Sequence, residues 1–204
     1  MNLPRSELSV GVLIPKMRVE IMPPAMWQEA DRLTRIEAEV AHPTLTMTVV
    51  AGGQVAVDRT VVERDGQFCA APRELTIRIG LTERVLLLPA PARRNACVKE
   101  ALLAHARQIE TLEKRIIQDF VAGTRGAFFR KLSALKRIPA STSDDAHQQF
   151  RRAVEEMVQA TVADLHAARL REVEALEAQT DHSDLANACA GALYDIVWPR
   201  RRRA

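Results

Sequence analysis

The stretch "ACVKEALLAHARQIETLEK", residues 96–114, decides how the second half of the chain folds. From it onward, apolar residues and one histidine recur at alternating steps of three and four, which places them on one face of an α-helix: Leu102, His105, Ile109, Leu112 and Ile116. Asn95 directly precedes the stretch and belongs to a residue type that caps helix N-termini. We expect the helix to span residues 96–121, because Gly123 and Gly126 follow and glycine is common where helices end.

The residues before position 95 favour β-strands. Segments rich in Val and Ile, separated by short turn signals, predict strands at residues 8–22, 44–50, 54–64, 74–81 and 83–89. Turns are expected at Gly52-Gly53 and Asp65-Gly66, and Gly80 is expected to lie between the last two strands. Connections this short favour antiparallel pairing. Helical spacing interrupts the pattern at residues 26–40.

The residues after position 123 are helical in pattern. A short basic segment is expected at 128–139, a break and a new cap at 139–145, a long helix at 145–179 and a last amphipathic segment at 184–198. The whole predicts an α+β fold, with a small antiparallel or mixed sheet in the N-terminal half followed by helix 96–121 and long C-terminal helices. We divide the chain into an α+β core, residues 1–122, and a helical region, residues 123–204, packed on the core or extending from it.

Composition narrows the class of protein. The chain has 204 residues, 47% of them apolar, which argues against wholesale disorder, and its net charge of +3 is too small to indicate nucleic-acid binding. No stretch reaches the roughly 18 apolar residues that a membrane span needs. The first residues also lack a convincing signal peptide, so the chain as written is expected to be cytoplasmic unless a leader precedes it.

Common catalytic motifs are missing from the sequence. We find neither a glycine-rich phosphate loop nor a G-x-S-x-G elbow, and no C-x-x-C pair. The cysteines are odd in number, so one must stay outside any intramolecular bridge: Cys69, Cys97 and Cys189. The histidines are too widely spaced for two of them to share one helix face: His42, His105, His147, His166 and His182.

The segment "DGQFCAAPRELTIRIGLTERVLLLPAPARRNACVKEALLAHARQIETLEKR" resembles the core of a bacterial family of secreted zinc-dependent proteases of the zincin type. In those domains a cysteine follows an Asp-Gly turn, and a second cysteine opens a helix that carries the metal motif H-E-x-x-H. Asp65-Gly66 and Cys69 match the first part, and Cys97 followed by "ALLAH" (101–105) matches the second. The resemblance covers about residues 44–120. It implies a zincin-like core, a zinc ion, and a periplasmic or secreted location.

The metal motif is degenerate in this chain, where it reads His105-Ala106-Arg107-Gln108-Ile109. A zinc hydrolase needs a glutamate general base directly after the first histidine and a second imidazole four residues on. Ala106 replaces the base and Ile109 replaces the second ligand, so we expect no catalytic residue here. Glu110 points about 140° around the helix from His105, and Glu113 lies about 12 Å along its axis.

His105 therefore has two interpretations. It is either a remaining metal ligand or a buried histidine beside Ile109 that is satisfied by one hydrogen bond.

The resemblance also implies a disulfide between Cys69 and Cys97. Such a bridge would stabilise the fold by roughly 3 kcal/mol in an oxidising compartment. That compartment conflicts with the missing signal peptide, because cytosolic thiols are normally reduced. Cys189 is interpreted as a small buried residue.

The sequence leaves three alternative hypotheses for the function. The first is a non-catalytic relative of the zinc peptidases that binds a partner protein, or a second copy of itself, through a groove or the long C-terminal helices; it needs no cofactor. The second is an active metallohydrolase in which His105 and ligands such as His166 or His182 hold zinc. The third is a nucleic-acid or membrane-surface binding protein that uses basic residues: Arg125, Arg130, Lys131, Lys136, Arg137 and Arg200–Arg203.

Overall fold

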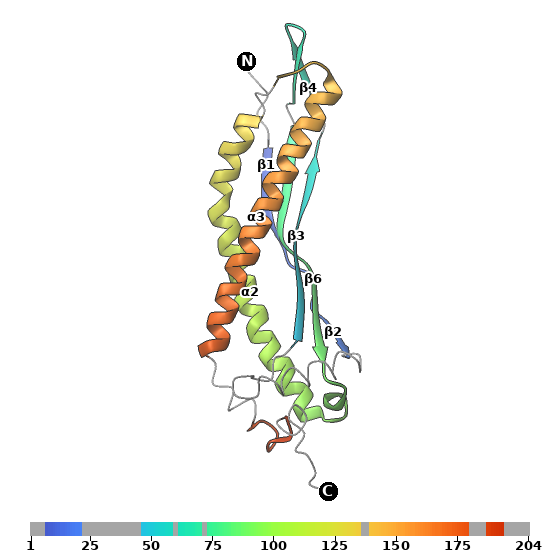
Figure 1. The fold of residues 1–204 in the computed structure, drawn as a ribbon, viewed down its shortest axis with the longest axis vertical. Helices are drawn as coiled ribbons and strands as arrows, with labels where there is room; N and C mark the ends of the chain where they lie inside the picture. The colour runs from blue at the N-terminus through green and yellow to red at the C-terminus, as the bar shows by residue number, and fades with distance from the viewer. Residues whose placement is uncertain are drawn as a thin grey trace, which may run out of the picture. The chain divides into compact units, whose positions relative to one another are not determined.

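The computed structural model describes residues 7–21, 46–58, 61–70, 73–135, 139–179 and 187–193. Figure 1 shows an α+β fold, as expected, in which N-terminal strands precede two long helices. The elements are β1 (Glu7–Leu13), β2 (Arg18–Ile21), β3 (Thr46–Val57), β4 (Val61–Arg64), β5 (Gln67–Ala70), β6 (Glu74–Leu88), the 3-10 helix η1 (Ala90–Arg94), α2 (Ala96–Leu135), β7 (Pro139–Ala140) and α3 (Ser143–Gln179). The helix expected at residues 26–40 lies outside the described residues.

The main sheet is organised around β6, which pairs with β1, β2 and β3. β1 and β2 both run parallel to β6, with Glu7 opposite Glu74 and Arg18 opposite Val85. The difference in residue number between a residue and its partner in β6 is the same in both pairings. The two strands thus divide the predicted strand 8–22 at Pro15, which cannot donate a hydrogen bond to a neighbouring strand. The expectation of antiparallel pairing is wrong for β1 and β2, because a long connection separates them in sequence from β6.

The turn expected at Gly52-Gly53 is wrong, since β3 continues through both glycines. Their role is to allow close approach. A Cβ on Gly53 would lie 2.4 Å from the Cγ1 atom of Val158 in α3, and one on Gly52 would lie 2.5 Å from the Cγ2 atom of Thr82 in β6. These glycines let neighbouring side chains pack directly on the backbone of β3.

Gly80 does not separate two strands either, because β6 runs without interruption from Glu74 to Leu88. A Cβ on Gly80 would lie 2.0 Å from the carbonyl oxygen of Leu13, which is its register partner in β1. Glycine at this position therefore permits the two strands to approach each other where β1 ends.

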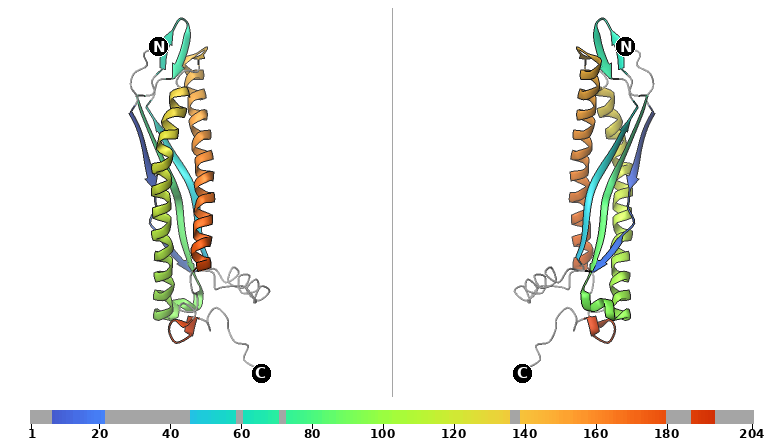
Figure 2. Two further views of the ribbon diagram at one scale, coloured as in Figure 1. Left: turned by 90° about the vertical axis from the view of Figure 1, so that its left-hand side faces the viewer. Right: turned by 90° about the vertical axis from the view of Figure 1, so that its right-hand side faces the viewer.

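The Asp65-Gly66 turn is confirmed. Both residues have positive φ, 55° for Asp65 and 74° for Gly66, as the tight turn of a two-residue hairpin requires. The turn joins β4 to β5, which pair antiparallel. β5 pairs in addition with β7, with Phe68 opposite Ala140, directly before α3 begins. Figure 2 shows the hairpin that β4 and β5 form from two further sides.

The two helices are longer than the sequence suggests. α2 does not end near Gly123 but continues to Leu135, so most of the basic segment 128–139 belongs to it. Val121, Phe128 and Leu132 are buried on both sides of the glycines, and this apolar burial outweighs the cost of about 1 kcal/mol that each glycine imposes on a helix. The proposed boundary between residues 122 and 123 lies inside α2, and that division of the chain stays a prediction.

The helix starts follow the predicted caps. The Oδ1 atom of Asn95 accepts a hydrogen bond of 3.2 Å from the N–H of Val98. The Oγ1 atom of Thr142 accepts one of 3.1 Å from the N–H of Asp145 and donates one of 2.8 Å to the Oδ2 atom of the same residue. Each contact satisfies a backbone donor that has no partner within the helix, so α2 and α3 begin where the sequence places these caps.

The chain forms two compact units. The first contains residues 1–15, 50–82 and 114–171, and the second contains residues 16–49, 83–113 and 172–204. Within the first unit, residues such as Ile77, Ile117 and Val154 are fully buried. The second unit has an apolar cluster, which we call the α2 cluster: Leu86, Leu88, Ala92, Val98, Leu102, Ala106 and Leu193.

Candidate functional site

The segment His105–Ile109, which the expected resemblance aligns with the metal motif, lies in the second unit, on the buried face of α2. Ala106 has no exposed surface and belongs to the α2 cluster, and Ile109 is also buried. The side chains at the positions that the expected resemblance assigns to a general base and a second ligand thus pack as core residues. A methyl group and a butyl group in these positions can neither accept a proton nor bind zinc.

His105 is buried as well, with 8% of its surface exposed. This agrees with its interpretation as a core histidine, and the residue has an interaction of its own within the chain. Among the described residues, no group of three or more His, Cys, Asp and Glu side chains is placed to hold a metal ion. His166 belongs to the first unit, where its Nδ1 atom has no hydrogen-bond partner among the described residues. His182 lies outside them.

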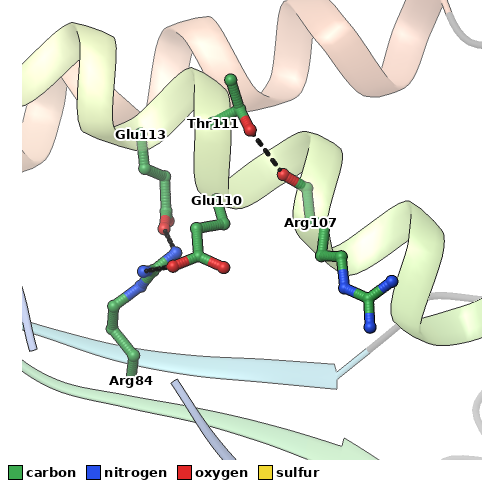
Figure 3. Close-up of polar contacts among 5 residues, drawn as sticks. All are labelled: Arg84, Arg107, Glu110, Thr111 and Glu113. Carbon is green, nitrogen blue, oxygen red and sulfur yellow. Dashed lines mark hydrogen bonds and ion pairs between the residues drawn. The ribbon is translucent and has the colours of Figure 1, made fainter. Parts of the chain in front are cut away.

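A charged cluster lies one to two turns further along α2 (Figure 3). Arg84 of β6 donates from Nη1 to the Oε1 atom of Glu110 at 2.9 Å and from Nη2 to the Oε2 atom of Glu113 at 2.8 Å. The side chains of Arg84 and Glu113 are 0% and 1% exposed, whereas Glu110 is 37% exposed. One guanidinium therefore holds two carboxylates, one of them in the protein interior.

The cluster decides which face of α2 is buried. The sequence pattern places Leu112 and Ile116 on the seam with Ile109, but the fully buried residues at this point are Glu113 and Ile117. Leu112 and Ile116 are half-buried. A buried glutamate breaks the apolar periodicity, and Arg84 is the reason that it can be buried.

The cluster has a defined chemical consequence. Glu110 and Glu113 are the carboxylates closest in sequence to the degenerate motif, and both are engaged by a cation. A carboxylate in an ion pair with arginine is a poor general base and a poor metal ligand, since its negative charge is already compensated. The Nε atom of Arg84 has no hydrogen-bond partner among the described residues. Arg107 lies apart from the cluster: its carbonyl oxygen accepts a 2.8 Å hydrogen bond from Thr111, and its side chain is exposed (Figure 3).

The cysteines pair differently from the expectation. Cys97 forms its disulfide with Cys189, and Cys69 is a free, buried cysteine, so the predicted Cys69–Cys97 bridge is wrong. The reason is topological. Cys69 lies in β5, whose partners are β4 and β7, all in the first unit, whereas Cys97 opens α2 in the second. Cys189 is thus not simply a small buried residue.

The basic residues of the third hypothesis are partly described. Arg125, Arg130 and Lys131 are exposed on α2. Lys136, Arg137 and the run 200–203 lie outside the described residues. Within the described part of the chain, no helix is long and apolar enough to cross a membrane.

Comparison with known proteins adds no relative: the chain matches no protein-family model, no curated protein and no solved structure.

Proposed function

We propose that the chain is a non-catalytic relative of the zincin-like zinc peptidases and acts by binding another protein. The observation that carries the proposal is the position of Ala106. Its methyl group stands where a zinc peptidase has its general base, and it is fully buried in the α2 cluster. A water molecule activated for hydrolysis needs a proton acceptor at this place, and an apolar core provides none.

The charged cluster supports the same proposal. Glu110 and Glu113 are the first two carboxylates that follow His105 on α2, and Arg84 engages both. A rearranged site would have to break a largely buried ion pair before either carboxylate could serve a metal, which is strongly unfavourable.

The long helices supply surfaces for a partner. α2 exposes Phe129, which is 42% accessible, and α3 exposes Leu170, which is 41% accessible. Large apolar side chains on charged helices are typical anchors in helix-mediated association. The partner is a second protein or a second copy of this chain.

Metal content tests the non-catalytic half of the proposal. The full chain, purified without chelator, is expected to contain substoichiometric zinc, and His105→Ala is expected to leave the zinc content unchanged. His147→Ala is the matched control, because His147 is half-buried on α3 in the first unit. Stoichiometric zinc that is lost in His105→Ala, retained in His147→Ala and accompanied by peptide hydrolysis would instead establish the metallohydrolase.

Site-specific photo-crosslinking tests the binding half. A photoreactive amino acid at position 129 is expected to give a discrete covalent adduct, either with one partner protein or with a second copy. The same label at position 134, where Ala134 is also exposed on α2, serves as the control. Equal adducts at both positions, or none at position 129, would contradict a binding role for this part of α2.

A further inference from the structure

The disulfide joins two parts of the chain that are far apart in sequence. Cys97 lies in the first turn of α2, and Cys189 lies in segment 187–193, at a sequence separation of 92 residues. Both cysteines belong to the second unit. The bond therefore ties segment 187–193 to the N-terminal end of α2.

Segment 187–193 covers part of the α2 cluster. Leu193 has no exposed surface and is a member of the cluster, and Cys189 and Ala192 pack against it. The residues beneath come from β6, η1 and the start of α2, namely Leu86, Leu88, Ala92, Val98 and Leu102. Removal of the segment would expose apolar surface at this end of the unit.

The backbone of the segment is held in an unfavourable conformation. Cys189, Ala190 and Gly191 have φ of 60°, 58° and 82° in succession. Two of the three are not glycine, and the left-handed region is unfavourable for residues that carry a Cβ. These angles also interrupt helical geometry at residues 189–191, within the last amphipathic segment that the sequence predicts at 184–198. A strained segment of this kind remains in place only while its surroundings, the disulfide included, hold it.

The disulfide is placed where it can be reduced. Cys97 is exposed, and it lies two residues after Asn95, the N-cap of α2, where the unpaired N–H groups of the first turn favour a negative charge. The first turn contains no acidic residue, and Arg93 and Arg94 precede it. A thiolate released at Cys97 is therefore stabilised, and this favours the reduced state.

We propose that the Cys97–Cys189 disulfide is a reducible latch, which holds segment 187–193 over the α2 cluster and releases it when a dithiol reductant opens the bond. The proposal does not depend on the binding function proposed above. It assigns to the oxidised chain a closed state and to the reduced chain an open one, in which the α2 cluster is accessible at the N-terminal end of α2.

The chemistry is a thiol–disulfide exchange in two steps. One thiolate of the reductant attacks the Sγ atom of Cys97, so that a mixed disulfide forms, the bond to Cys189 breaks, and Cys189 leaves as a thiolate that takes up a proton. The second thiol of the reductant is then deprotonated and attacks the first sulfur atom of the reductant, which is bonded to Cys97 in the mixed disulfide. This attack releases Cys97 as a thiolate. The dithiol loses two electrons and becomes a disulfide, and the protein disulfide gains these two electrons and becomes two thiols.

Hydrogen–deuterium exchange on the full chain tests the latch. The oxidised protein is treated with dithiothreitol without denaturant, and alkylation followed by mass spectrometry measures the free thiols. We expect Cys97 and Cys189 to be reduced under these native conditions. Amide exchange in 187–193 should then rise more than tenfold, with a gain in binding of a dye specific for apolar surface. Residues 150–165 of α3, which belong to the first unit, should stay protected over the time in which 187–193 exchanges.

Two variants make the test decisive. Cys97→Ser/Cys189→Ser should show fast exchange in 187–193 without any reductant, and Cys69→Ser, which alters only the free cysteine, should behave as the unmodified chain does. Reduction that requires denaturant, or reduction that leaves 187–193 protected, would overturn the proposal. Loss of protection along the whole chain would also overturn it, because that outcome means global unfolding rather than the release of one segment.

Discussion

Arg84 places a positive charge where its side chain has no contact with solvent. Removal of a guanidinium from water is costly, and the cost is offset only by well-formed contacts to an opposite charge. Two carboxylates supply this opposite charge: Glu113 is buried, and Glu110 is partly exposed to solvent. The three residues connect β6 to α2 through charges rather than through apolar packing.

Substitution of Arg84 should therefore be severe. Arg84→Met removes the cation that faces the buried Glu113 carboxylate, and we expect it to lower the free energy of unfolding by about 3–5 kcal/mol. Chemical denaturation measures the loss. Arg78→Met is the matched control, since Arg78 lies on the same strand with an exposed side chain and should change stability by less than about 0.5 kcal/mol.

The double substitution Arg84→Met/Glu113→Leu should recover much of the lost stability, because apolar residues of similar volume can replace a buried ion pair. Recovery no better than Arg84→Met alone would contradict this account of the cluster.

Ala106 is a buried apolar residue, and a charge at its position should be costly for the same reason. Ala106→Glu, which introduces the glutamate that an H-E-x-x-H motif would have at this position, would place a carboxylate inside the α2 cluster, and we expect a loss of about 3 kcal/mol or more in unfolding free energy. Ala104→Glu on the exposed face of the same helix should be close to neutral. Thermal denaturation of both variants measures the difference. Equal stability would mean that the site is open to water and could accommodate a catalytic group.

Among the elements, β6 is the strand on which the sheet depends, because β1, β2 and β3 all pair with it. The pairing of β1 with β6 requires a close approach at Gly80, where the neighbouring atom is the backbone oxygen of Leu13. A backbone atom in a paired strand cannot move aside as a flexible side chain can. The requirement for glycine at position 80 thus comes from backbone geometry and not from hydrophobicity.

Gly80→Ala should consequently disturb the end of the β1–β6 pairing. We expect it to lower the free energy of unfolding by about 1–3 kcal/mol, the usual cost of overpacking. Gly11→Ala is the control in the same pair of strands: the nearest atom to its new Cβ is the Cγ of Arg78 at 4.0 Å, an ordinary contact. Urea denaturation of the two variants should separate them, and equal effects would refute the close approach at Gly80.

The elements show what local sequence can predict. The caps at Asn95 and Thr142, the Asp65-Gly66 turn and the long helix α3 were predictable, since each depends on hydrogen bonds or dihedral angles within a few residues. Gly52-Gly53 and Gly80 were predicted as turns or breaks because glycine serves both turns and close packing. Only the partners Val158 and Leu13, distant in sequence, distinguish the two uses.

The candidate site was predictable to the same extent. The sequence shows that apolar residues, Ala106 and Ile109, occupy the positions that the proposed resemblance assigns to catalytic groups, but it does not show that Arg84 engages Glu110 and Glu113. Arg84 lies 26 and 29 residues before them, and no local pattern links an arginine in a strand to two glutamates in a helix. Glu113 lies in the series formed by Ile109, Ile117 and Val121 at steps of four residues, and a glutamate in this otherwise apolar series is the one signal that could have raised the question.

At the scale of the whole molecule, the disulfide closes a large loop. A bond between residues 92 apart in sequence restricts the unfolded chain strongly, and the chain-entropy model assigns it a stabilisation of about 4–5 kcal/mol. The loop includes the rest of α2 and all of α3. The stability of both helices is thus linked to the oxidation state of one bond.

Removal of the bond should lower the stability of the entire chain. Cys97→Ser/Cys189→Ser is expected to lose about 4 kcal/mol in unfolding free energy, measured by denaturation with guanidinium chloride under non-reducing conditions. Cys69→Ser should lose far less, because no bridge is broken. If both variants unfold at the same denaturant concentration, the Cys97–Cys189 bond does not form in solution.

The parallel pairing of β1 and β2 with β6 has a consequence for synthesis. Residues 7–21 leave the ribosome well before their partners at 74–88. At typical translation rates the delay between the synthesis of these two segments is on the order of several seconds. During it, an apolar β-segment has no native neighbour to pair with and is open to association with other nascent chains. Yield from cells should therefore depend on chaperones that shield such a segment until translation reaches Leu88.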